Sequence, residues 1–111
     1  AAPMYLAPAA RAVDTRTGSG GRLAAGARQA YDLGDATNGL LAQVTVISPG
    51  NNGYLSVYPC DDPQGETTSV LNAKTGENNA NVVLMRTDAE GRLCAYTSMA
   101  TDIIIDVIGR A

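Results

Sequence analysis

Segments typical of β-strands recur along this chain about every eight to twelve residues. Turn-forming runs rich in Gly, Pro, Asn and Asp separate these segments. Most of the segments alternate apolar and polar residues, a period of two that is typical of a half-buried strand. They cover residues 28–34, 43–48, 53–59, 81–87, 92–98 and 102–109. This recurrence predicts an all-β fold, an antiparallel β-sandwich with a jelly-roll-like or Ig-like topology.

The size of the chain suits one such sandwich. With 111 residues, we expect a single domain over 1–111. Apolar residues make up 45% of the chain, which is enough for a core without a metal or several disulfides. Because the chain has 5 Tyr but no Phe or Trp, small aliphatic side chains must fill most of that core.

Charge and composition argue against several classes of function. The net charge is −3 and the basic residues do not cluster in the sequence, so we expect no nucleic-acid partner. No apolar run approaches the roughly 20 residues of a membrane span, so we expect no membrane partner. The lack of His removes the commonest general base and the usual zinc sites. We therefore expect neither an enzyme, nor a metal, nor a cofactor.

The chain has two cysteines, Cys60 in "VYPCDD" and Cys94 in "RLCAYT". In a small domain without His, such a pair predicts a disulfide between neighbouring strands, and the alternative is two reduced, buried thiols. A disulfide would indicate an oxidising compartment or an extracellular particle.

An acid and an arginine, Asp14 and Arg16, precede a glycine-rich run at residues 17–21. Asp106 interrupts an apolar strand near the end of the chain, where an unpaired charge would be costly. We expect a structural clasp, in which a buried Arg16 bonds Asp106 and Asp14 bonds backbone amides of the glycine-rich turn. The alternatives are a ligand site, or a carboxylate pair for glycoside hydrolysis.

Four polar side chains form a candidate ligand-binding set: Tyr54, Tyr58, Asn72 and Asn81. Asparagine amides can bond sugar hydroxyls and tyrosine rings can stack on sugars, which makes surface glycans a candidate partner. The alternative is that the tyrosines belong to the core and the asparagines to turns.

Five motifs occur in an order that resembles a module of actinobacterial secreted and surface proteins. They are "RAVDTRTGSGGRLAAG" (11–26), "GYLSVYPC" (53–60), "LNA" (71–73) with Gly76, "NVV" (81–83) and "IIIDVIG" (103–109). The resemblance implies a β-sandwich accessory domain without known catalysis, and similar domains occur in virion proteins of phages that infect those bacteria. One departure is the closing "GRA" where the module has G-Y-F, so residues 3–8 or a neighbouring subunit must cover that end.

The resemblance and the composition together predict a non-catalytic structural or binding subunit displayed on an outer surface. A phage virion structural or decoration protein of the capsid or tail ranks first, because a single module without linkers suits a docking subunit. The alternative is a secreted adhesion or carbohydrate-binding module. In either case we expect extracellular or surface exposure, and protein partners at an exposed sheet edge, as a homo-oligomer or on a larger assembly.

Overall fold

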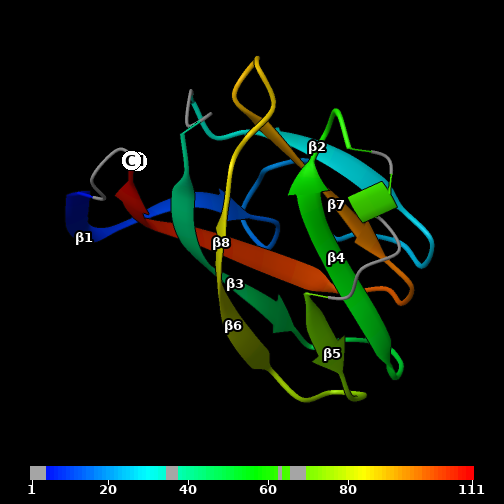
Figure 1. Cartoon of the computed structure of the whole chain (residues 1–111). Helices are drawn as coiled ribbons and strands as arrows, with labels where there is room; N and C mark the ends of the chain where they lie inside the picture. The colour runs from blue at the N-terminus through cyan, green and yellow to red at the C-terminus, as the bar shows by residue number, and fades with distance from the viewer. Residues whose placement is uncertain (1–4, 35–37, 63, 66–69) are drawn as a thin grey trace.

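The computed structural model describes residues 5–34, 38–62, 64–65 and 70–111, leaving out the side chains of residues 5–8. In this part of the chain, eight strands form two four-stranded antiparallel sheets that face each other (Figure 1). The predicted all-β sandwich is therefore confirmed. The strands are β1 (Tyr5–Asp14), β2 (Arg28–Asp32), β3 (Leu40–Ile47), β4 (Gly53–Pro59), β5 (Leu71–Ala73), β6 (Asn79–Met85), β7 (Arg92–Thr97) and β8 (Asp102–Arg110).

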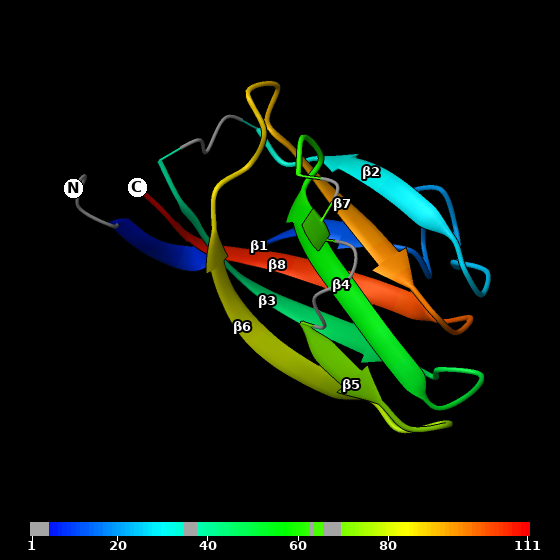
Figure 2. The same ribbon diagram turned by 45° about the vertical axis from the view of Figure 1, so that its right-hand side comes forward.

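The pairing of the strands is that of a long hairpin that has been rolled up. β4 pairs with β5, β3 with β6, β2 with β7 and β1 with β8. Rolling places β8 beside β3 and β7 beside β4, which gives the strand orders β1-β8-β3-β6 and β2-β7-β4-β5 (Figure 2). Eight strands in this order form a jelly roll, which decides between the two predicted topologies.

Aliphatic side chains fill the space between the sheets. On β3 and β8, alternate residues such as Val44, Val46, Ile103 and Ile105 point inward and are fully buried. The facing sheet contributes Leu93 and similar residues of β4 and β7. Inward rows of β-branched and aliphatic residues are what a sandwich of two half-buried sheets requires.

The structure differs from the sequence-based prediction in several local respects. β1 lies outside the six predicted segments, β3 begins at Leu40 rather than at residue 43, and β6 covers Asn79–Met85 rather than 81–87. β5 spans only Leu71–Ala73, which is too short for alternation to reveal. The sequence of the turn at residues 88–92, "DAEGR", resembles a hairpin loop, and Gly91 has the positive φ of such a loop, +81°. This turn is not a hairpin between paired strands, because it leads from β6 in one sheet to β7 in the other.

The closing "GRA" is held by hydrogen bonds rather than by an aromatic side chain. Arg110 donates from Nη2 to the carbonyl of Leu33 at 2.6 Å, and the amide of Ala111 donates to the carbonyl of Gly39. The end of β8 is thereby joined to the segment that follows β2. The cover expected from residues 3–8 lies outside the described residues and side chains.

A disulfide joins Cys60 and Cys94, as predicted. Cys60 follows the last residue of β4, and Cys94 lies in β7 opposite Tyr58 of β4. The bond, with a Cα–Cα distance of 4.9 Å, therefore links adjacent strands of one sheet. It is compatible with an extracellular location.

Replacing both cysteines by alanine should lower the free energy of unfolding. The two positions are 34 residues apart, and closing a loop of that size stabilises a fold by about 3–4 kcal/mol in the chain-entropy account. Urea denaturation of the oxidised protein and of the Cys60→Ala, Cys94→Ala variant measures the difference. Equal unfolding midpoints, or two thiols that alkylate without reductant, would contradict this prediction.

Candidate functional site

The predicted bond between Arg16 and Asp106 is wrong, and Arg11 takes the place of Arg16. Arg11 donates from Nε to Oδ1 of Asp106 at 3.0 Å and from Nη2 to Oδ2 at 3.4 Å. The cause is the strand register, which sets Arg11 directly opposite Asp106. Because β1 ends at Asp14, Arg16 lies beyond the strand and is exposed rather than buried. The clasp between the first and last strands exists, but at the solvent-facing surface.

Asp14 and Arg16 instead bond each other. Arg16 donates from Nε and Nη2 to the two carboxylate oxygens of Asp14, each at 3.0 Å, and its backbone amide also donates to Oδ1. These bonds lower the pKa of Asp14, and the side-chain hydrogen bond from Arg16 has the largest effect. The amides of Thr17 and Gly18 donate to the main-chain carbonyl of Asp14. The carboxylate therefore does not bond the amides of residues 17–21, which corrects that part of the prediction.

A buried hydroxyl that the sequence did not single out connects this turn to β8. Thr15 donates from Oγ1 to Oδ1 of Asp102 at 2.8 Å and accepts the amide of Ile103 at 2.9 Å. The other oxygen of Asp102 accepts Nη1 of Arg22 at 3.0 Å. Thr15 is buried, so this contact stabilises the junction more than the exposed arginine pairs do. A threonine after an aspartate gives no sequence signal for such a role.

The tyrosines of the candidate binding set lie in different environments. Tyr58 is buried, and Gly65 lies so close to it that a Cβ at position 65 would collide with the tyrosine. Tyr54 is half-buried, opposite Asn72, and packs with its ring 5.8 Å from that of Tyr96. The structure therefore brings Tyr54 and Asn72 together, and buries Tyr58 under Gly65, on the face of β4 opposite to Leu55 and Val57 of the core.

Asn81, the other asparagine of that set, has a structural role that Asn79 shares. Each side chain donates from Nδ2 to a carbonyl near β5, Asn79 to Asn72 at 3.1 Å and Asn81 to Val70 at 3.0 Å. Each Oδ1 accepts the next amide of β6, those of Ala80 and Val82, at 3.0 Å. The two amides therefore connect the sheets along the side formed by β5 and β6.

The four strands at the sheet edges are each limited as templates for another strand. β1 has two register shifts against β8, and β5 has three residues. On β2, Gln29 donates from Nε2 to the carbonyl of Ala30. On β6, Asn79 and Asn81 occupy main-chain amides. Bulges, short edges and occupied backbone groups all discourage edge-to-edge pairing.

The outer face of β6 carries large exposed apolar side chains. Val82 is 51% exposed and Leu84 is 67% exposed. Leu41 of β3, which is partly buried, lies directly opposite Leu84. We call Leu41, Val82 and Leu84 the β6 patch. No residue of β6 is charged.

Comparisons with known proteins identify no relative of this chain. No protein-family model, no curated protein and no solved structure matches the chain. None of the described residues forms a helix long and apolar enough to cross a membrane.

The hydrogen bonds rank the residues around the glycine-rich turn by their effect on stability. Thr15→Val should lower the free energy of unfolding by about 1–3 kcal/mol, because it leaves the buried amide of Ile103 without its acceptor. Arg16→Ala should change stability much less, because its ion pair is exposed to solvent. Thermal and urea unfolding of both variants test this order. An equal or larger loss of stability in Arg16→Ala than in Thr15→Val would contradict this order.

Removing the bridging amide at position 81 should weaken the side formed by β5 and β6. Asn81→Ala should cost about 1–3 kcal/mol, for two hydrogen bonds at roughly 0.5–1.5 kcal/mol each, and should speed hydrogen exchange at the Val82 amide. Asn38→Ala, at an exposed asparagine in the loop before β3, is the control. The bridge has no energetic role if the two variants unfold at the same urea concentration.

Proposed function

We propose that this chain is a non-catalytic structural subunit that docks on a larger protein assembly at an outer surface. The observation that carries the proposal is the β6 patch. Three neighbouring apolar side chains on the solvent-facing side of a sheet are typical of an interaction surface, whereas scattered single ones are common on any protein.

The chemistry of β6 favours a protein surface as the partner. The strand presents no charge, so it has nothing to pair with an anionic glycan or a nucleic acid. Its edge amides at Ala80 and Val82 are occupied, which favours contact through side chains over strand addition. The partner we propose is an apolar surface of the particle that carries this subunit.

The carboxylates support a structural role more than catalysis. Asp14, Asp61, Asp88, Asp102 and Asp106 each pair with an arginine at 3.0–3.1 Å. A catalytic acid needs a raised pKa, whereas the pKa of Asp88 is lowered, mainly by the backbone amide of Arg92. The pKa of Asp14 is lowered too.

Of the two outer surfaces, we propose a phage virion first and a secreted adhesion or carbohydrate-binding module second. The motif resemblance to actinobacterial surface modules and to virion proteins of their phages supports both. The Cys60–Cys94 disulfide suits a particle or a protein exposed to an oxidising environment. Jelly rolls occur in viral capsids and in lectins, a likeness at the level of fold alone.

The natural protein should be found on phage particles, and the β6 patch should hold it there. Immunogold microscopy of the particle and cell-envelope fractions of the source culture locates it. Labelling of the envelope alone would favour the adhesion alternative, and labelling of neither fraction would contradict surface display.

To test the patch, the labelled protein is sedimented with particles, and the wild type should co-sediment with them. The Leu84→Gln variant should lose this binding. It should keep its melting temperature, because Leu84 is 67% exposed. Thr45→Gln on the neighbouring strand is the control. Equal retention of wild type and Leu84→Gln would exclude the patch. A second copy of this chain could also cover the β6 patch, and sedimentation equilibrium of the isolated protein tests this alternative. A dimer that depends on Leu84, without binding to particles, would overturn the proposal.

A further inference from the structure

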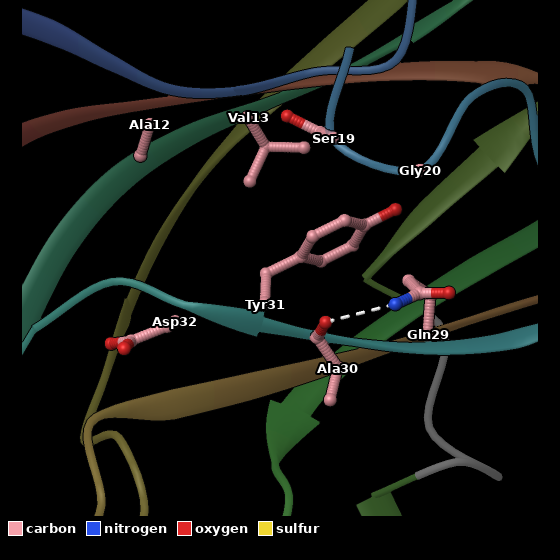
Figure 3. Close-up of a pocket in the computed structure, with 8 residues that line it drawn as sticks. All are labelled: Ala12, Val13, Ser19, Gly20, Gln29, Ala30, Tyr31 and Asp32. Carbon is pink, nitrogen blue, oxygen red and sulfur yellow. Dashed lines mark hydrogen bonds between the residues drawn. The ribbon is translucent and has the colours of Figure 1, made fainter.

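A pocket lies between the edge strands β1 and β2, on the side of the sandwich away from β6. Its volume is about 270 Å³. Figure 3 shows Val13 of β1 and the turn with Ser19 and Gly20 on one side, and residues of β2 on the other. This pocket contains none of the residues of the β6 patch, and it includes no residue of the predicted clasp.

Tyr31 of β2 lines this pocket and carries an unsatisfied hydroxyl. The residue is 6% exposed, and its hydroxyl is the one buried side-chain polar atom among the described residues that has no hydrogen-bond partner. Burial raises the pKa of Tyr31 to about 12, so the hydroxyl keeps its proton and can donate. An unpaired buried hydroxyl destabilises a fold, which makes this atom a position where a ligand acceptor would be favourable.

The turn over the tyrosine has a left-handed backbone at three consecutive residues. In Figure 3 the Tyr31 side chain extends from β2 toward Ser19 and Gly20. Ser19 has a φ of +52°, and Gly20 and Gly21 have φ values of +87° and +83°. No atom lies within 4 Å of where a Cβ would stand on Gly18 or Gly21. These two glycines therefore contribute no side-chain packing that would hold the turn in place, and a ligand that bonds the buried hydroxyl has to displace this turn.

The polar groups of the pocket restrict the charge of its ligand. No lysine or arginine lines it, so nothing there would neutralise a phosphate or a carboxylate. Asp32 points away from the Tyr31 hydroxyl in Figure 3, and its carboxylate accepts the amide of Gly34 at 2.9 Å. Gln29 lies on the same side of β2 as Tyr31, and its Oε1 can accept a hydrogen bond from a ligand. A matching ligand is neutral, and has at least one acceptor and one donor.

We propose that this pocket binds a single neutral sugar unit. One sugar hydroxyl oxygen accepts from Tyr31, another hydroxyl donates to Oε1 of Gln29, and the carbon-bound face of the ring packs on Val13. The volume suits a ligand smaller than a drug-sized molecule, because pockets for drug-sized ligands span about 300–1,000 Å³ and this one lies just below that range. The sugar is either a free monosaccharide or the terminal unit of a glycan. The site is independent of the docking function proposed above.

Titration of the ¹⁵N-labelled protein with glucose, galactose, mannose and N-acetylglucosamine, each as the free sugar and as its methyl glycoside, tests the proposal. At least one should produce saturable amide shifts at Ser19, Gly20 and residues 29–32. The glycoside arm separates the sources, because a terminal glycan unit binds as the glycoside and a free sugar binds only with its anomeric hydroxyl unblocked.

Tyr31→Phe should weaken binding about tenfold, the loss of one hydrogen bond, while keeping or raising the melting temperature because it removes an unsatisfied hydroxyl. Gln29→Ala should also weaken it. Tyr96→Phe, on the outer face of β7, should bind as the wild type does. Three results would overturn the proposal: no saturable shift with any probe, equal affinity in Tyr31→Phe, or a long-lived water at the Tyr31 hydroxyl that persists at saturating sugar.

Discussion

The pairing of β8 with both β1 and β3 is the constraint on which the rest of this structure depends. β8 sends Ile103, Ile105 and Val107 into the core and points Asp102 and Asp106 to the other face. Because those two carboxylates accept Arg22, Thr15 and Arg11, the last strand fixes both β1 and the turn after it. Once β8 lies between β1 and β3, the hairpin is rolled and the second sheet must follow.

The two open sides of the rolled hairpin are treated differently by the sequence. On the β5–β6 side, Asn79 and Asn81 each bond the opposite sheet and their own strand. On the β1–β2 side, Gln29 bonds only its own strand, and a pocket remains. Side-chain amides thus limit strand addition at both edges, while the outer face of β6 stays apolar. A surface closed to strand pairing but open to side-chain contact suits specific docking better than aggregation.

Local pattern was sufficient for the class of fold and for the disulfide, but not for the site. Alternation marks a strand wherever one face is buried, so β4 was located to the residue, and two cysteines in strand-like segments left one pairing. Strand register is non-local: a shift between Arg11 and Val13 sets Arg11, rather than Ala12, opposite Asp106, and Arg16 lies beyond the end of β1. The choice between jelly roll and Ig topology also depends on which strands pair. The motif resemblance stays a prediction.

The residues of the pocket were beyond sequence analysis for a related reason. Tyr31 has the alternation of a core position, and nothing in "RQAYDLG" indicates that its hydroxyl ends without a partner. That follows only from the place of β2 at a sheet edge, next to an edge strand of the other sheet and under a turn of glycines. A core tyrosine usually bonds a neighbour or water. In this jelly roll the asparagines bridge the β5–β6 side, and the one buried hydroxyl without a partner among the described residues lies at the β1–β2 side, under the glycine-rich turn.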